Sequence, residues 1–201
     1  GDMTFESIDV PGAAATLATE NNVSTDNFSD GGAPTTFVKA GPGTLTLDNS
    51  GGGLSAAATT FDVSDGTMKT AGAAPMGGST DLVLSGGTAS FGDTAGTPPV
   101  PPGVADIDVT VTAAGSRLEA NTADPVTFNS VTVQDGADLA TGGSIPGIGF
   151  EQTNLVAGTQ TYKPEVPTTL TETSGLVNAS SPGDTVRLVA AGTSDLILNK
   201  D

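Results

Sequence analysis

Carboxylates are the side chains of this sequence that could do chemistry, because it contains neither histidine nor cysteine. The segment Asp106-Ile107-Asp108 places two carboxylates on one face of an expected strand, about 7 Å apart by strand rise. Two acids at such a distance suit an inverting glycoside hydrolase. We favour the simpler interpretation, in which Asp106 and Asp108 lie on the solvent-exposed face of the strand while Ile107 and Val109 point inward.

A second group of oxygen ligands lies in the segment DNFSDGG, which begins at Asp26 and contains Asp30. Calcium takes roughly six to eight oxygens, so Asp26 and Asp30 are candidate calcium ligands. The spacing matches neither an EF-hand loop nor the nonapeptide calcium repeat. Aspartate and asparagine also occur in turns for their own local hydrogen bonds, and we favour that interpretation. The sequence therefore predicts no cofactor. Calcium is the one cation whose binding to Asp26 and Asp30 should be tested.

The charge balance excludes several partners. The chain has 201 residues, 6 Lys and Arg against 23 Asp and Glu, and a formal net charge of −17. Such a surface repels phosphates, so we expect no nucleic acid partner and no binding to anionic membranes. No apolar run approaches the roughly 20 residues of a membrane helix, so we expect no membrane insertion by this segment.

Short alternating strands separated by glycine turns recur along the chain. The stretch FVKAGPGTLTLDN, from Phe37 to Asn49, contains one such turn followed by a Thr-Leu-Thr-Leu alternation. Turn glycines at comparable places are Gly43, Gly66, Gly87, Gly115 and Gly136, which are separated by 23, 21, 28 and 21 residues. The insertion GTPPVPPG at 96–103 accounts for the longest spacing. A repeat of roughly 20 to 25 residues with short strands is typical of a β-solenoid.

The alternation also predicts which side chains form the core. Leu45 and Leu47 should point inward, as should Phe61 and Val63, while Asp62 faces solvent. Helices are disfavoured by the frequency of Gly, Thr and Pro. We therefore predict an all-β chain folded as a right-handed parallel β-helix. The alternative is a β-sandwich, which would show more varied spacing and larger core residues.

The regular period does not extend over the whole chain. We expect solenoid rungs over 1–140, with the proline-rich insertion at 96–103 projecting from them. After Thr141 the glycine period is lost, so 141–201 is predicted to form irregular rungs or a capping segment of the same domain. An antiparallel hairpin is a further possibility for this part.

One stretch resembles a known family. The segment from Lys39 to Leu47, KAGPGTLTL, and the segment from Thr59 to Met68, TTFDVSDGTM, are similar to the autotransporter-associated β-strand repeat. The resemblance covers about residues 36–70, and Met68 stands where the family usually has leucine. It implies a parallel β-helix in the passenger region of a bacterial surface protein. The family contributes no catalytic residues.

The expected function is therefore structural or adhesive: a rigid stalk or passenger of a bacterial extracellular or cell-surface protein. The alternative is a carbohydrate-binding module or a polysaccharide-active β-helix protein. We expect no enzyme, because the two arginines, Arg117 and Arg187, are not in a recognisable catalytic setting. Expected partners are a host or neighbouring-cell surface protein, a glycan, or a second copy of the chain.

Overall fold

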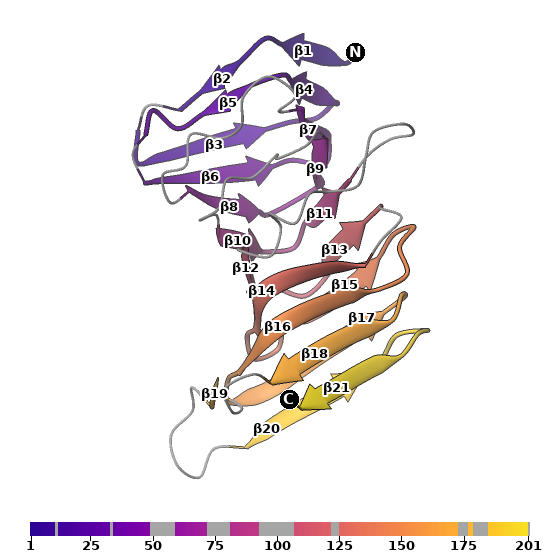
Figure 1. Cartoon of the computed structure of the whole chain (residues 1–201). Coiled ribbons are helices and arrows are strands. Elements are labelled where there is room, and N and C mark those ends of the chain that lie inside the picture. The colour runs from indigo at the N-terminus through magenta and orange to yellow at the C-terminus, as the bar shows by residue number, and fades with distance from the viewer. Residues whose placement is uncertain are drawn as a thin grey trace.

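The computed structural model describes residues 1–10, 12–32, 34–48, 59–71, 81–92, 107–121, 125–172, 177–178 and 185–200. These residues form strands and turns, with no helix among them and hence none that could cross a membrane. The strands stack in parallel as a β-solenoid (Figure 1), as the sequence predicted. The sandwich alternative is wrong, because every recorded pair of described strands is parallel.

The described strands form two long sheets and one short sheet. The first has nine strands in the order β1 (Met3–Phe5), β4 (Val23–Thr25), β7 (Thr44–Asp48), β9 (Thr67–Ala71), β11 (Thr88–Phe91), β13 (Ser116–Ala120), β15 (Asp138–Gly142), β17 (Gly158–Pro164) and β20 (Val186–Ala190). The second has ten: β3 (Ala14–Ala18), β6 (Thr35–Ala40), β8 (Thr59–Val63), β10 (Asp81–Leu84), β12 (Asp108–Val111), β14 (Val126–Val133), β16 (Ile148–Leu155), β18 (Thr168–Glu172) and β21 (Leu196–Lys200), with β19 (Val177–Asn178) also paired to β16. The short sheet pairs β2 (Ile8–Asp9) with β5 (Phe28–Ser29).

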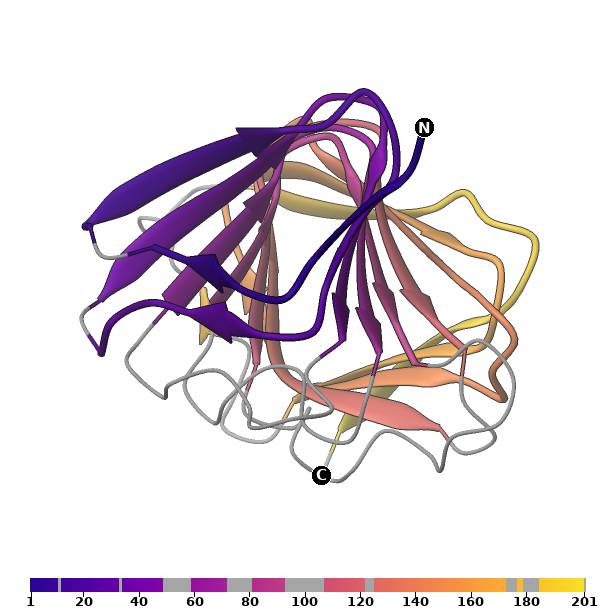
Figure 2. The same cartoon turned by 90° about the horizontal axis from the view of Figure 1, so that it is seen from above.

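The chain adds one strand to each long sheet in every turn, so residues about 20 to 30 positions apart become neighbours. Figure 2, which looks down the stack, shows successive strands rotated relative to one another, as parallel strands normally are. The strands that follow Thr141 continue both long sheets to the C-terminal end. The insertion at 96–103 lies outside the described residues.

The core consists of inward-facing side chains stacked from turn to turn. Leu45, Leu47, Phe61 and Val63 are all buried, as the alternation predicted. Phe37 pairs in register with Phe61, and their ring centroids lie 5.8 Å apart. Because each turn buries its inward side chains only against its neighbours, the stack has one continuous core.

The corner between β6 and β7 explains the segment KAGPG. Gly41 has φ of 76°, a left-handed conformation that glycine adopts without strain. A Cβ atom on Gly43 would lie 2.2 Å from the backbone oxygen of Asn21 on the preceding turn, so this position needs glycine for space. The left-handed residue of this corner is therefore Gly41 rather than Gly43.

Lys39 closes the same corner from inside. Its side chain is fully buried, and its ammonium group donates hydrogen bonds to the backbone oxygens of Ala40 (3.1 Å), Gly41 (2.7 Å) and Asp65 (3.1 Å). Burial lowers the pKa of Lys39, and the nearby charge of Asp65 opposes this shift. The lysine thus ties the corner of one turn to the corner of the next.

Candidate functional site

The two candidate calcium ligands have different environments. Asp30 is fully buried, and its carboxylate accepts hydrogen bonds from the Gly32 amide (2.8 Å) and the Thr59 hydroxyl (2.6 Å). Asp26 is exposed, and its backbone amide donates to Phe5 on the preceding turn. Within the described part of the chain, no three acidic side chains gather in a way that could hold a metal ion. The geometry thus gives Asp30 the role of a buried turn cap.

The sequence pair Asp106 and Asp108 is only half described, since Asp106 lies outside the described residues. Asp108 is outward, and it accepts hydrogen bonds from Asn129 Nδ2 (2.7 Å) and Ser130 Oγ (2.6 Å) on the next turn. The register places Asp81 of β10 directly beside Asp108 of β12. Partial burial, and then the like charge of Asp108, raise the pKa of Asp81. The structure therefore brings together two carboxylates that are 27 positions apart in the sequence.

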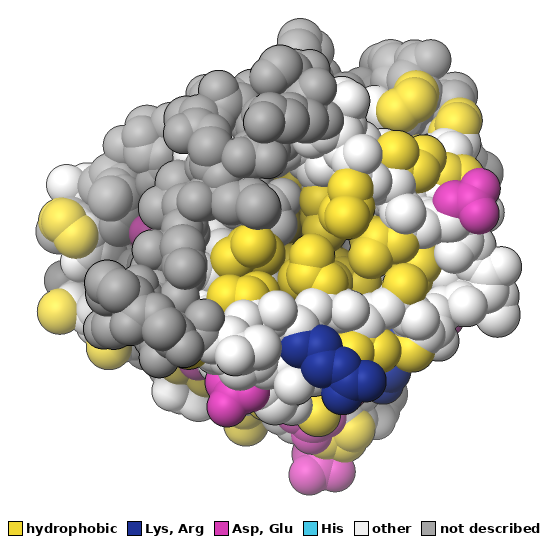
Figure 3. Space-filling model, turned by 90° about the horizontal axis from the view of Figure 1, so that it is seen from below, with side chains coloured by type: hydrophobic (Ala, Val, Ile, Leu, Met, Phe, Trp, Pro, Cys, Tyr) yellow, Lys and Arg dark blue, Asp and Glu magenta, His cyan; other side chains and the backbone are white. Residues whose placement is uncertain are grey.

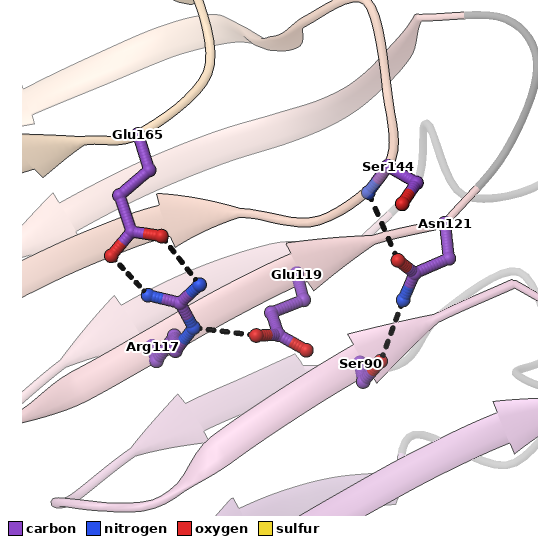
Figure 4. Close-up of polar contacts among 6 residues, drawn as sticks. All are labelled: Ser90, Arg117, Glu119, Asn121, Ser144 and Glu165. Atoms are coloured by element: carbon purple, nitrogen blue, oxygen red, sulfur yellow. Dashed lines mark hydrogen bonds and ion pairs between the residues drawn. The ribbon is translucent and has the colours of Figure 1, made fainter. Parts of the chain in front are cut away.

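Arg117 is held in a network on the outer face of the first sheet (Figure 4). Its guanidinium forms two parallel bonds with Glu165, at 2.6 and 2.7 Å, and its Nε donates to Glu119 at 2.6 Å. Gly142 of β15 lies next to this ion pair. A Cβ atom at that position would be 2.3 Å from Arg117 Nη2, so a larger residue would clash with the guanidinium. These bonds, that to Glu165 above all, raise the pKa of Arg117 further, so it is not placed to act as a base.

Asn121 makes a second connection between turns, also drawn in Figure 4. Its amide nitrogen donates to Ser90 Oγ at 3.2 Å, and its side-chain oxygen accepts from the backbone amide of Ser144 at 3.0 Å. Asn121 therefore joins adjacent turns, while Arg117 reaches across β15 to the turn of β17 on the same face.

A groove of about 680 Å³ lies on the outer face of β14, β16, β18 and β21. These strands run side by side across the front of Figure 1. Register places Thr127, Gly149 and Thr169 in one outward column, which forms the floor. The backbone at Gly149 does not have a left-handed φ, so its conformation does not require glycine. Because glycine has no side chain, the floor of the groove is open at this position.

Prolines form one wall of the groove and polar side chains form the other. Pro125, Pro146 and Pro167 are exposed and precede β14, β16 and β18. The ladder brings these three segments side by side, since the Val126 amide donates to the Gly147 oxygen at 3.2 Å and the Ile148 amide donates to the Pro167 oxygen at 2.9 Å. The polar lining residues outside the floor column are Glu151, Thr171 and Asn199.

The lining favours a neutral, hydroxyl-rich ligand. Hydroxyl, amide and carboxylate groups bind sugar hydroxyls, and proline rings offer flat apolar contact. No lysine or arginine belongs to the described lining, and Glu151 adds negative charge, so an anionic ligand is disfavoured.

Sequence reasoning missed both the groove and the Asp81–Asp108 pair. Each is formed by residues on different turns, and their approach depends on the register between strands. The one local signal was the set of prolines before successive strands. No protein-family model, no curated protein and no solved structure matches this chain.

Proposed function

We propose that this chain is a rigid β-helical stalk or passenger segment, with a structural or adhesive role in a bacterial extracellular or cell-surface protein. The observation that carries the proposal is the continuous stack of parallel strands in both long sheets. Each added turn lengthens such a stack by about 4.8 Å, and every internal strand is hydrogen-bonded on both sides. A stack of this kind resists bending because its turns share one core.

The resemblance to the autotransporter-associated repeat supports the bacterial surface setting. Its characteristic residues have physical tasks in this fold: Lys39 binds three backbone oxygens, and Leu45 and Leu47 are buried. The polar connections through Arg117 and Asn121 add stiffness between turns. High negative charge suits an exported, soluble rod.

A distance measurement between two labels tests the rigidity. Spin labels at Thr46 of β7 and Thr161 of β17 would lie five strand steps apart, about 24 Å along the axis. The chain has no native cysteine, so two introduced cysteines would be labelled specifically. A stalk predicts one narrow distance distribution that is unchanged by molecular crowding. A broad distribution would contradict the proposal.

The groove supports a second candidate function, the binding of a neutral polysaccharide. Its outward columns repeat every strand step, about 4.8 Å, which is close to the length of one sugar unit in an extended glycan. Four adjacent strands contribute to the lining, so about three sugar units would fit along the floor. A stalk and a glycan-binding surface are compatible in one adhesive segment.

Affinity gel electrophoresis over a panel of polysaccharides tests this second candidate, scored for retention and for release of soluble sugar. Retention without release would support glycan binding, and Gly149→Val should abolish it by filling the floor. The matched control is Thr110→Val, an outward substitution on β12 of the same sheet but outside the groove. Failure of every neutral glycan to retain the protein would overturn this function. Release would instead indicate a hydrolase and direct attention to Asp81 and Asp108.

A further inference from the structure

Aspartate is followed directly by glycine at three places in the sequence: Asp30-Gly31, Asp65-Gly66 and Asp135-Gly136. In each pair the glycine has a left-handed φ, of 68°, 63° and 75° respectively. An aspartate before glycine can form a five-membered imide, because glycine has no side chain to keep its nitrogen away from the carboxyl carbon. The three pairs therefore share one possible reaction, and the bonds of each carboxylate decide where it can occur.

The first pair holds its two reacting groups apart. The Asp30 carboxylate is fully buried and accepts hydrogen bonds from the Gly32 amide at 2.8 Å and the Thr59 hydroxyl at 2.6 Å. The amide of Gly31 donates instead to Ser29 Oγ at 3.3 Å. Both carboxylate oxygens are occupied and shielded from water, so this pair should not react.

The third pair is exposed, but both of its reacting groups are bonded to the next turn. Asp135 Oδ1 accepts a hydrogen bond from the Thr159 amide at 2.8 Å, and the Gly136 amide donates to the Thr159 oxygen at 3.1 Å. A Cβ atom on Gly158 would lie 2.2 Å from Asp135 Oδ1, so the carboxylate lies directly over that glycine. These contacts with β17 keep the Asp135 carboxylate away from the Gly136 nitrogen.

The second pair, at the corner between β8 and β9, brings its two reacting groups together. The Gly66 amide donates a hydrogen bond to Oδ1 of the Asp65 carboxylate, and the nitrogen and the oxygen are 2.7 Å apart. Reaction is favoured where the attacking and attacked groups are already held in contact in the ground state. Asp65 is also exposed, so water can reach the carboxyl group. Of the three pairs, this one has the contact that the reaction needs.

A buried cation lies against the same peptide group. The chain has 6 Lys and Arg against 23 acidic residues, and on the face drawn in Figure 3 the basic side chains gather in one place at the surface. Lys39 differs, because its side chain is buried and its ammonium group donates to the backbone oxygen of Asp65 at 3.1 Å. A positively charged donor stabilises the negative charge that develops on a carbonyl oxygen when water attacks the carbon. Lys39 is therefore placed to activate the Asp65 backbone carbonyl.

We propose that Asp65-Gly66 is a site of spontaneous isoaspartate formation, promoted by Lys39. The Gly66 nitrogen forms a bond to Asp65 Cγ, and one carboxylate oxygen leaves as water with the amide hydrogen and a proton from solvent. Water then adds to the Asp65 backbone carbonyl carbon, and the bond from that carbon to the Gly66 nitrogen breaks. The nitrogen regains a hydrogen, a proton is released, and the chain now continues through Cγ.

Lys39 favours this product over the return to aspartate, which would follow attack of water on Cγ. The oxygen that Lys39 binds becomes part of a free α-carboxylate, so a charged acceptor replaces a neutral one beside the ammonium group. The inference goes beyond the proposed function, because it concerns a covalent change at one corner and does not depend on a stalk or on glycan binding.

Peptide mapping of the aged chain tests the proposal. The folded protein and a urea-denatured sample are incubated at neutral pH and physiological temperature, and then digested with a protease that cleaves before aspartate but not before isoaspartate. Mass spectrometry measures the isoaspartate at each pair. Folding should slow the reaction by about tenfold or more at Asp30 and Asp135, and should preserve or accelerate it at Asp65. Equal suppression at all three pairs would overturn the proposal.

Two substitutions are controls for the site. Asp65→Glu should abolish the product, because its longer side chain would have to close a six-membered ring. Asp135→Glu, at the matched pair, should leave the reaction at Asp65 unchanged. Product at Asp65-Gly66 that is lost in both variants would contradict the assignment.

Incubation in oxygen-18 water tests the role of Lys39, because it labels both the aspartate and the isoaspartate that arise from the imide. Lys39→Met should lower the share of isoaspartate among the labelled products at Asp65. The urea-denatured wild-type chain, in which Lys39 no longer binds the corner, should show the same lower share and serves if the variant does not fold. An isoaspartate share equal to that of the folded wild type in both samples would show that Lys39 does not direct the reaction.

Discussion

The corner of β6 and β7 and the turn of β17 and β20 both bury polar side chains, but they differ in how these groups are bonded. At the first, the buried ammonium of Lys39 has three backbone acceptors, and the buried carboxylate of Asp30 nearby in sequence has two donors. At the second, the buried Tyr162 hydroxyl and the Gln160 side-chain oxygen have no hydrogen-bond partner. Unpartnered buried polar atoms cost free energy, so the C-terminal turns should be less stable.

The two halves of the chain also differ in the number and the size of the buried side chains that have unpaired polar atoms. Thr19 and Thr70 in the first half also have unpaired hydroxyls, but these belong to small side chains. In the second half the unpaired atoms belong to Thr153, Gln160 and Tyr162, which lie on the adjacent strands β16 and β17. In a solenoid, where stability is roughly a sum over neighbouring turns, such a concentration should produce a gradient along the axis.

The largest expected effect comes from the aromatic core of the first half. Phe61→Ala should lower the free energy of unfolding by about 3 to 5 kcal/mol, because it leaves a cavity beside Phe28 and Phe37. Leu198→Ala should cost less than about 1 kcal/mol, because most of that side chain is already exposed. Urea denaturation followed by circular dichroism measures both. Equal losses would remove the difference between the two regions.

The next effect tests the Lys39 corner. Lys39→Met keeps the apolar stem but leaves the backbone oxygens of Gly41 and Asp65 without this donor. We expect a loss of about 2 to 3 kcal/mol in the free energy of unfolding. Lys69→Met, at an outward position on β9, is the matched control and should change little. A neutral Lys39→Met would show that the corner does not depend on the ammonium group.

Tyr162→Phe should raise the free energy of unfolding, in contrast to the preceding substitutions. Removing the unpaired hydroxyl should stabilise the protein by about 1 kcal/mol at neutral pH. Burial also raises the pKa of Tyr162, so the folded state keeps this proton at a pH where the unfolded state loses it. The stability of the wild-type protein should therefore fall as pH rises above the ordinary tyrosine pKa of about 10. The advantage of Tyr162→Phe should therefore grow in alkaline denaturation. Thr161→Val, outward on the same strand, is the control, and a destabilised Tyr162→Phe would mean that the hydroxyl has a partner.

The smallest effect concerns the outer face. The raised pKa of Asp81 means that its ionisation opposes folding, so stability should fall as pH rises from the ordinary aspartate pKa of about 4 through the higher folded value. Asp81→Asn should remove this fall and gain less than about 1 kcal/mol at pH 7, because the group is exposed and screened by solvent. Thermal melts at several pH values measure it, with Asp195→Asn as the control. A pH profile identical to wild type would indicate that Asp81 and Asp108 do not interact.

The fold could be predicted from the sequence because its signals are local. Alternation placed Leu45, Leu47, Phe61 and Val63 in the core, and glycine turns indicated stacked rungs. The sequence left irregular rungs, a cap and an antiparallel hairpin open after Thr141, because those corners use proline and isolated glycines instead of a regular period. The groove and the contact between Asp81 and Asp108 depend on the register between turns, which the spacing of glycines does not determine. The hydrogen bond between Asp30 and Thr59 could not be predicted either, because the two residues are 29 positions apart.

Native-state hydrogen exchange, read strand by strand, tests the central contrast most directly. We expect amides of β6 to β9 to exchange only through global unfolding, and those of β17, β18, β20 and β21 to exchange through a lower-energy opening. Uniform protection along the axis, or stronger protection in the last turns than around Lys39, would contradict it.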